Sequence, residues 1–216
     1  MKLIMGLGNP DQNYENTRHN AGFMALDFFK NSQSGFSDWQ NSEKFKAEIS
    51  EGEIDIPPSS EDYGVAKEKI ILAKPQTFMN LSGQAARLLK DFYKMEFSDI
   101  IVLHDDLALP LGQFRLSQNS ASAGHNGVQN VIENLGSQNF GRIRLGIKPA
   151  SDSPLYKGGL GGIFSKWIFK TPSEKFVLQK FSAEELKIIN SVIEKSNQAL
   201  KTILAENFQT AMNRFN

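Results

Sequence analysis

Two short apolar runs separated by a helix-length segment limit this chain to few folds. The runs are KIILAKP (69–75) and DIIVLHDD (99–106), and the segment NLSGQAARLLKDFYK (80–94) lies between them. The runs are typical of buried strands, and the segment between them is typical of a helix. A strand, a helix and a second strand in this order form a right-handed crossover, which makes the two strands parallel. The sequence therefore predicts an α/β fold.

The remaining elements complete a single domain over residues 1–216, a length that suits one core of ordinary size. Ser182 and Glu185 form a capping box that predicts the start of a long amphipathic helix. A piece rich in Gly, Ser and Pro, residues 149–167, is interpreted as a mobile loop. Further strands are expected at 2–7, 112–118 and 141–148, a hairpin at 45–56 across Glu51-Gly52, and helices at 21–30, 124–136 and from 183 to 215. We predict a twisted, mixed, largely parallel sheet flanked by helices.

Composition excludes several kinds of protein. The chain has no Cys, so disulfides, thiolate metal sites and thiol nucleophiles are absent. With three histidines, a zinc cluster would also need carboxylates, and no His-Glu-x-x-His spacing exists, so a metal enzyme is not expected. No apolar run is long enough to span a bilayer and no signal peptide is recognisable, so we expect a cytoplasmic protein.

The charge of the chain is neutral overall but unevenly distributed. Residues 142–180 contain eight Lys or Arg and two acidic residues, Asp152 and Glu174. Such a stretch is a candidate surface for a polyanion. On charge alone, a solvated basic face explains it equally well.

The first strand is followed by GLGNPD (6–11), which invites comparison with a dinucleotide-binding turn. Asp11 stands where that motif needs its third Gly, and Pro10 would block the approach of a helix N-terminus to a pyrophosphate, so a dinucleotide site is disfavoured. The turn does place the amide of Asn9 at a strand end, where ligands of open α/β sheets bind. Capping of the turn is the alternative role.

A histidine and a carboxylate follow at two further positions. His19 lies at the start of the helix predicted for 21–30, where the helix dipole favours neutral imidazole, the form that a general base needs. The alternative is that His19 caps this helix. His104, Asp105 and Asp106 follow a buried strand in VLHDDLALP (102–110), and one of the two carboxylates could orient an imidazole. Without Cys or a Gly-x-Ser-x-Gly elbow, water activated by His is the simplest hydrolytic mechanism.

Two more turns carry asparagines among small residues. Asn80 lies in PQTFMNLSG (75–83) and Asn126 in SASAGHNGV (120–128), and each turn follows a predicted strand and opens a helix. An amide donates and accepts hydrogen bonds, so it suits an ester or peptide carbonyl and a positioned water. Ordinary helix capping is the alternative for each residue.

Together these motifs resemble one family. GLGNP, YENTRHNAGF, KPQTFMNLSG, HDDLALPLG and GHNG, with the strand RIRLGI, are similar in content and order to the motif series of bacterial peptidyl-tRNA hydrolase, across residues 3–147. The resemblance implies hydrolysis of the ester between a peptide and the 3′ end of tRNA, without metal or cofactor. Its partner would be peptidyl-tRNA, and we expect a monomer.

The resemblance also implies roles for residues at matching positions. His19 would be the general base, Asp105 would hold it in its basic form, and Asn9 would help to tell blocked from free aminoacyl groups. The site for the tRNA end and the peptide would be lined by Tyr14, Phe78, Asn80 and Asn126. The tRNA phosphates would face Arg115 and Arg144. Alternation in the strands predicts that Arg115, Arg142 and Arg144 point outward, unless they pair with the acidic 48–62 region.

Three departures from the family pattern and two competing functions remain. Asp11 replaces the usual Gly after Asn-Pro, SASAGHNG has fewer glycines than the usual loop, and the Gly-rich stretch 149–167 is longer than expected at that place. An RNA-binding protein without catalysis is one competitor, but it would not need the pair His19–Asp105. A small-molecule α/β hydrolase is the other, disfavoured by the missing nucleophile and by the basic stretch.

Overall fold

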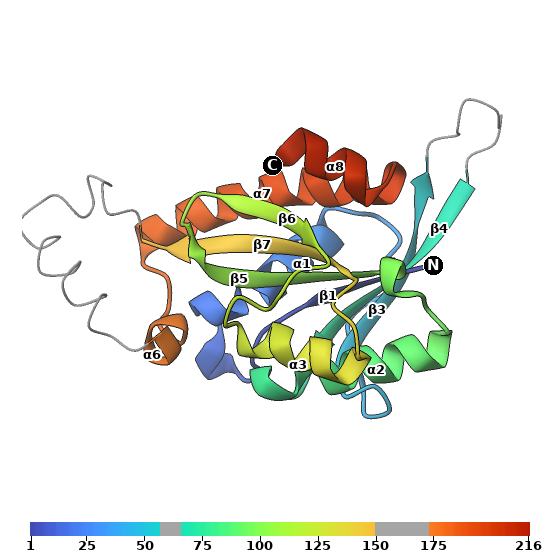
Figure 1. Ribbon diagram of the computed structural model, residues 1–216, viewed down its shortest axis with the longest axis horizontal. Helices are drawn as coiled ribbons and strands as arrows, with labels where there is room; N and C mark the ends of the chain where they lie inside the picture. The colour runs from blue at the N-terminus through green and yellow to red at the C-terminus, as the bar shows by residue number, and fades with distance from the viewer. Residues whose placement is uncertain (57–65, 150–172) are drawn as a thin grey trace, which may run out of the picture.

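The computed structural model describes residues 1–56, 66–149 and 173–216 (Figure 1). Most of the predicted loop 149–167 lies outside these residues. The strands are β1 Lys2–Gly6, β2 Gln40–Ser42, β3 Ala47–Ile56, β4 Ala66–Pro75, β5 Ile100–Pro110, β6 Phe114–Gln118 and β7 Gly141–Lys148. The α-helices are α1 Ala21–Asn31, α2 Ser82–Tyr93, α3 Asn126–Leu135, α6 Ser173–Val177, α7 Ala183–Ala205 and α8 Phe208–Phe215. Short 3-10 turns η1 Gln12–Tyr14, η2 Arg18–Asn20, η3 Met79–Leu81 and η4 Phe97–Asp99 complete the elements.

The strands form one seven-stranded sheet in the order β2-β3-β4-β1-β5-β7-β6. Strand β1 is parallel to β4 and to β5, and β7 is parallel to β5, whereas β2, β3 and β6 pair antiparallel. The prediction of a mixed, largely parallel sheet is confirmed. After β1 the chain forms β4 on one side of it and β5 on the other, so β1 lies at the topological switch point, where ligands of such sheets bind.

The expected hairpin in residues 45–56 is wrong. This segment is the single strand β3, which pairs with β4 along its whole length, from Ala47 opposite Pro75 to Ile56 opposite Ala66. Gly52, which was expected to turn the chain, lies in the middle of the strand with the ring of Phe36 against it, closer than a Cβ would allow. Pairing with a neighbouring strand, absent from the local pattern, keeps the segment extended.

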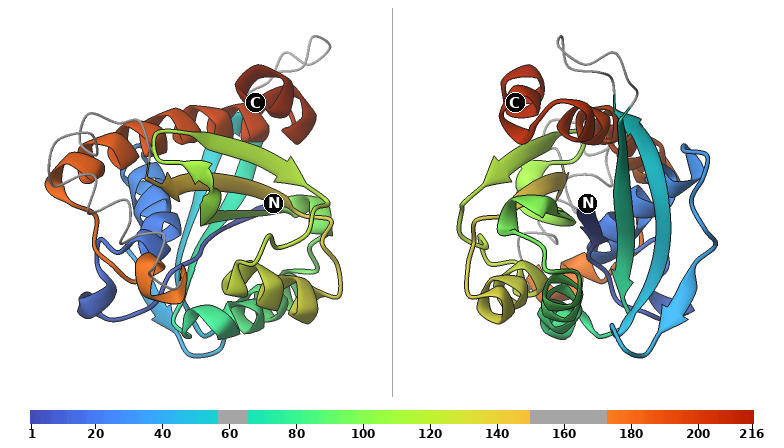
Figure 2. Two further views of the ribbon diagram at one scale, coloured as in Figure 1. Left: turned by 60° about the vertical axis from the view of Figure 1, so that its left-hand side comes forward. Right: turned by 90° about the vertical axis from the view of Figure 1, so that its right-hand side faces the viewer.

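Helices cover both faces of the sheet (Figures 1 and 2). Side chains alternate along β1, so that Ile4 packs with α1 and α7 while Leu3 and Met5 pack with α2 and α3. Every one of these three residues is 0% exposed, which is why β1 is an apolar run without polar alternation. The sheet is therefore packed between two apolar cores, one on each face.

The predicted C-terminal helix is confirmed at its start and wrong at its length. Ser182 and Glu185 form the reciprocal capping box of α7. The helix ends at Ala205, and Asn207 then begins α8 by accepting a hydrogen bond from the backbone N–H of Thr210. The apolar spacing continues across the break, so the pattern alone did not reveal the new cap.

One edge of the sheet is shaped to hold a site. The pairing of β1 with β5 stops at Gly6 opposite Leu103, while β5 continues to Pro110. Gly22 of α1 packs against the backbone of Leu7 and Leu103 with no room for a Cβ, and this close approach brings the turn before α1 onto the end of β1.

No helix among the described residues is long and apolar enough to cross a membrane.

Candidate active site

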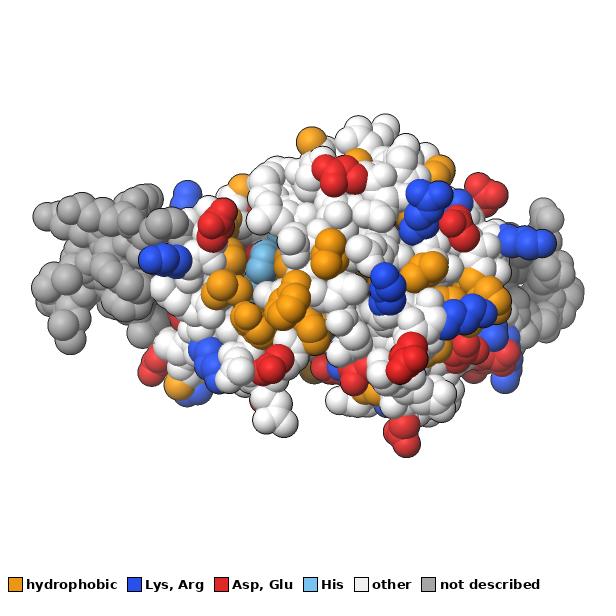
Figure 3. Space-filling view, turned by 90° about the horizontal axis from the view of Figure 1, so that it is seen from below, with side chains coloured by type: hydrophobic (Ala, Val, Ile, Leu, Met, Phe, Trp, Pro, Cys, Tyr) orange, Lys and Arg blue, Asp and Glu red, His pale blue; other side chains and the backbone are white. Residues whose placement is uncertain are grey.

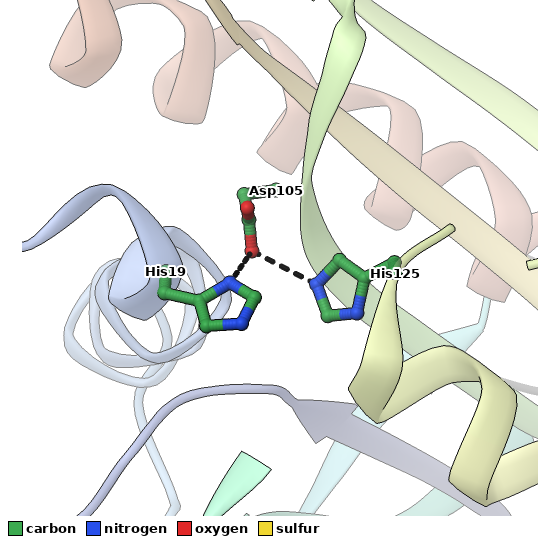
Figure 4. Close-up of side chains that lie close together, drawn as sticks. All are labelled: His19, Asp105 and His125. Atoms are coloured by element: carbon green, nitrogen blue, oxygen red, sulfur yellow. Dashed lines mark hydrogen bonds and ion pairs between the residues drawn. The ribbon is translucent and has the colours of Figure 1, made fainter. Parts of the chain in front are cut away.

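Three side chains from three separate segments meet beyond the end of β1 (Figure 4). His19, from the turn before α1, lies with Nδ1 2.9 Å from Oδ1 of Asp105 on β5. His125, at the start of α3, lies with Nε2 2.9 Å from the same oxygen. The two imidazole centres are 4.9 Å apart. Asp105 is only 1% exposed, so its carboxylate is shielded from water and interacts with these two rings instead.

The hydrogen bonds fix where the protons lie. A carboxylate oxygen only accepts, so both His19 Nδ1 and His125 Nε2 donate to Asp105. The other nitrogen of His125, Nδ1, accepts from the backbone N–H of Val128 at 3.2 Å. Both nitrogens of His125 are therefore occupied. Among the described residues, Nε2 of His19 has no hydrogen-bond partner, and in Figure 4 it points away from Asp105.

The electrostatics of this group follow from its burial. Burial by itself raises the pKa of Asp105, but the neighbouring imidazoles of His19 and His125 outweigh it and hold the pKa well below its usual range. Carboxylates at a strand edge would ordinarily be expected near water, and here Asp105 and Asp106 are both buried because each has a partner.

The third histidine has a structural place. His104 is buried, and its Nδ1 donates to the main-chain oxygen of Asp105 at 2.7 Å, while its Nε2 has no partner among the described residues. Burial lowers the pKa of His104 well below its usual value, and the nearby His125 lowers it further. His104 therefore stays neutral and braces the backbone that carries Asp105.

Asn9 is held in one orientation. Asn20 accepts from the backbone N–H of Asn9 at 2.8 Å and donates to its carbonyl at 3.0 Å. Oδ1 of Asn9 accepts from the backbone N–H of Met79 at 2.8 Å. The amide NH2 of Asn9 is the part left without a partner among the described residues, so Asn9 presents a donor and not an acceptor.

The other predicted substrate residues lie on three turns, those of η1, of η3 and of the start of α3. The ring of Tyr14 meets that of Phe78 edge to face, with centroids 6.4 Å apart, and Phe78 is 56% exposed. Asn80 is exposed on η3, which Asn9 holds through Met79. Asn126 lines a pocket with His19, Asp105 and His125, closed on another side by residues of α6.

Helix capping, the alternative role, is not what the polar residues do. The residue before α1 is Asn20, and no side chain caps that helix. No side-chain cap is present at η3 or at α2 either, so Asn80 does not act as one. At α3 the cap is His125 and not Asn126. The side chains of His19, Asn80 and Asn126 therefore remain available for a ligand.

The arginines differ from one another. Arg115 on β6 is exposed and lies opposite Arg144 of β7 in the ladder. Arg144 is half-buried and donates from Nε to Asp106 at 2.6 Å. The expected outward orientation of Arg142 is wrong: it is 1% exposed and donates to the carbonyls of Ser120 and Ala121.

Arg142 is buried because it supports the loop that leads to His125. Burial lowers its pKa to about 10, with a smaller contribution from Arg144, so it stays charged at neutral pH. Neither Arg142 nor Arg144 pairs with the acidic residues of β3 in the part of the chain that the structure describes.

The three residues His19, Asp105 and His125 are also the group that could hold a metal ion within the described ranges, since one ligand atom of each lies within 4.8 Å of the others. Two imidazoles and a carboxylate suit several divalent ions. In this structure the same atoms already bond one another directly, with donor and acceptor in each pair.

His125 is the functional candidate that sequence reasoning missed. It lies in GHNG, a motif that was interpreted only through Asn126. Only the fold shows that the turn before α3 reaches Asp105.

Asp11, which replaces the family's usual Gly, has a φ of 92°, a backbone region that favours Gly. Its carboxylate compensates by accepting a hydrogen bond from the backbone N–H of Asn13.

Comparisons with known proteins agree with one another. The family model described as Peptidyl-tRNA hydrolase matches residues 3–216. The chain is 41% identical to the peptidyl-tRNA hydrolase of Bacillus cytotoxicus, covering 100% of both chains. It is 39% identical to that of Lachnoclostridium phytofermentans, covering 100% of this chain and 97% of the relative. The solved structure of peptidyl-tRNA hydrolase from Acinetobacter baumannii superposes with a TM-score of 0.77 at 27% identity, over 100% of this chain and 94% of the other.

Proposed function

Because this chain belongs to the peptidyl-tRNA hydrolase family and releases peptides from tRNA, we propose that it does so by means of a water molecule that His19 deprotonates. The observation that carries this mechanism is the difference in hydrogen bonding and burial among the ring nitrogens of the three histidines. His125 has both nitrogens bonded and His104 is buried, whereas His19 keeps Nε2 unbonded within the described residues, next to a pocket. A general base needs such a nitrogen within reach of the water.

In the proposed reaction, Nε2 of His19 takes a proton from water while the oxygen attacks the ester carbonyl. The positive charge that develops on the imidazole is stabilised by Asp105, which accepts from Nδ1 at 2.9 Å. The tetrahedral intermediate then expels the ribose oxygen, which takes the proton back from His19. Peptide acid and tRNA are the products, and no acyl-enzyme forms.

The asparagines are proposed to recognise the acyl group. Asn9 presents its NH2, because its oxygen is bound to Met79, and an NH2 donor suits a neutral carbonyl. The α-ammonium of a free aminoacyl-tRNA also donates hydrogen bonds, so it would face the NH2 of Asn9 as donor against donor. This mismatch disfavours binding. Asn80 and Asn126 lie on neighbouring turns and complete the contact.

The tRNA is proposed to bind through phosphates to the strand pair that carries Arg115 and Arg144. Contacts of this kind position the backbone without reading sequence, as an enzyme that accepts many tRNAs requires. We also propose that the protein acts as a monomer in the cytoplasm, since all three residues at the centre come from one chain and the substrate is made during translation.

The direct test measures peptide release from N-acetyl-aminoacyl-tRNA and from free aminoacyl-tRNA, without added transition metal. We expect rapid release from the blocked substrate only. In Asn9→Ala or Asn80→Ala the ratio of the two rates should narrow, while Gln12→Ala, on the exposed turn η1, should keep the wild-type ratio. Binding of the blocked substrate without any release would identify an RNA-binding protein and refute the proposal.

A further inference from the structure

A row of exposed apolar side chains starts at η3, beside the candidate active site, and continues along α2 in the direction that leads away from it. Leu81 is 41% exposed, Leu88 38% and Phe92 53%. They are seven and four positions apart, so they lie on one side of the helix. Exposed apolar side chains that line up on one surface mark candidate binding sites. We define the α2 stripe as Leu81, Leu88 and Phe92.

The stripe is continuous with the candidate active site. Leu81 ends η3, the turn whose first backbone N–H is bound by Asn9, and α2 begins at the next residue. Phe78, at the other end of η3, is itself exposed and in contact with Tyr14. Figure 3 shows apolar side chains beside the histidine visible on that face and further apolar side chains across the same face. A ligand leaving the site over η3 would therefore reach α2.

We propose that the α2 stripe binds apolar side chains of the peptide part of peptidyl-tRNA, beyond the residues held next to the ester. The inference rests on the proposed function. The ester divides the substrate into a polyanion and a peptide, and these must leave the site in different directions. The exposed cation Arg115, on β6 at the edge of the sheet beyond β7, suits the polyanion, whereas the aliphatic surface of Leu81 and Leu88 suits the peptide.

Single-stranded RNA is a poorer occupant of this stripe. RNA bases bind by stacking on aromatic faces. Phe92 is the aromatic residue of the stripe, and Nζ of Lys44 lies 3.2 Å from its ring centroid, so this face is covered. Phe45 and Tyr93 meet Phe92 in edge-to-face contacts. One face of the ring is therefore occupied by a cation, and the two leucines offer no aromatic face for stacking.

The length of the stripe sets a length of peptide. From Leu81 to Phe92 the helix rises about 16 Å at 1.5 Å per residue. An extended peptide covers that distance with about five residues at 3.3 Å each. A substrate with a single blocked residue cannot reach Phe92, whereas one with eight residues can.

The test compares kcat/KM for three substrates: a single-residue N-acetyl-leucyl-tRNA, a blocked eight-residue peptidyl-tRNA rich in Leu, and one rich in Ser. The variants are Leu88→Ser alone, and Leu88→Ser with Phe92→Ser. The matched control is Phe28→Ser, which removes a comparably exposed aromatic residue from α1. On the Leu-rich substrate we expect kcat/KM to fall about five- to tenfold in the double variant and less in the single one. The other two substrates and the control should stay within about twofold of wild type.

Two results would overturn the inference while leaving the proposed function intact. One is an unchanged kcat/KM on the Leu-rich substrate in both variants. The other is an equal fall on the single-residue substrate, which would assign the stripe to tRNA binding or to the support of η3. Failure of the wild-type protein to hydrolyse the single-residue substrate would instead refute the proposed function, and the inference with it.

Discussion

Arg18 and His19 are adjacent in the chain, both are buried, and each is paired with a distant carboxylate, yet their surroundings differ. Arg18 binds both oxygens of Glu185 at 2.7 and 2.8 Å and lies over the rings of Phe176 and Phe181. It also donates to the carbonyl of Lys180. His19 has one nitrogen bonded to Asp105 and the other directed to a pocket.

The difference teaches how one turn can support both structure and chemistry. A guanidinium stays charged, so a buried Arg–Glu pair is a fixed connection between the turn and α7. An imidazole can gain and lose a proton near neutral pH, provided that one nitrogen is left accessible. The fixed pair of Arg18 holds the backbone in place so that the titratable group next to it keeps its orientation.

The largest expected effect is on turnover. His19→Ala should lower kcat roughly 10²–10⁴-fold, because a positioned general base contributes about that much. Its thermal unfolding should remain close to that of wild type, since His19 makes one side-chain hydrogen bond among the described residues. Single-turnover release of N-acetyl-aminoacyl-tRNA measures the change. Retention of more than about a tenth of the wild-type rate would remove His19 from the role of base.

Arg18→Met should show the opposite behaviour. Removing one partner of a buried ion pair destabilises a protein by about 3–5 kcal/mol, because the other charge stays buried. Urea unfolding gives this free energy, and at low temperature the folded variant should lose less activity than His19→Ala. Addition of Glu185→Gln should restore part of the stability, since the charge is then removed while the amide oxygen can still cap α7. Wild-type stability of Arg18→Met would contradict the comparison.

Asp105→Asn should reduce turnover more than binding. A neutral amide at position 105 would carry no negative charge to stabilise the developing imidazolium while it accepts from both His19 and His125. We therefore expect kcat to fall about ten- to a thousandfold. KM for the blocked substrate should change little. A rise in KM with kcat preserved would instead place Asp105 in contact with the substrate.

His104 should make stability depend on pH. Its pKa is lowered in the folded protein, so below the unfolded value of 6.5 the unfolded state binds the extra proton and the folded state does not. The stabilisation is present above pH 6.5 and is lost as the pH falls. The free energy of unfolding should therefore be lower at pH 5.5 than at pH 7.5.

Urea unfolding at the two pH values measures that loss, and His104→Asn is the matched variant. Its amide can keep the donor to the main-chain oxygen of Asp105 without titrating. The drop in stability between the two pH values should be smaller in this variant than in wild type. Equal drops would show that His104 does not cause the pH dependence.

The smallest effect concerns the cations. Binding of tRNA should weaken with salt, and Arg115→Ala should flatten the log–log slope by up to about one unit for one lost phosphate contact. Arg144→Ala should flatten it less, since Arg144 is already paired with Asp106. Lys201→Ala, exposed on α7 outside the basic stretch 142–180, is a control for general charge. Identical slopes for all four proteins would make the arginines structural.

Much of the fold could be predicted because its signals are local. Apolar runs identified β1, β4, β5 and β7, and the capping box identified the start of α7. Where the outcome depended on a partner far away in the chain, the prediction was wrong. The continuous strand β3 is an example, because it is held by pairing with β4.

The sequence by itself determined part of what gathers at the site. Parallel strands end at the same edge of a sheet, so the polar residues that follow β1 and β5 were expected there. The resemblance to the family added the pairing of His19 with Asp105, whose atoms lie 2.9 Å apart. Alternation along β6 likewise placed Arg115 outward.

Only the tertiary structure decided the state of each group. It brought His125 to the same oxygen of Asp105, turned the Asn9 amide by bonding its oxygen to Met79, and buried Arg142 under the loop before α3. Each of these outcomes is a competition for hydrogen bonds between segments that are distant in the chain. Residue order sets which segments can meet, but the bonds form only where packing removes water and leaves each donor a single acceptor.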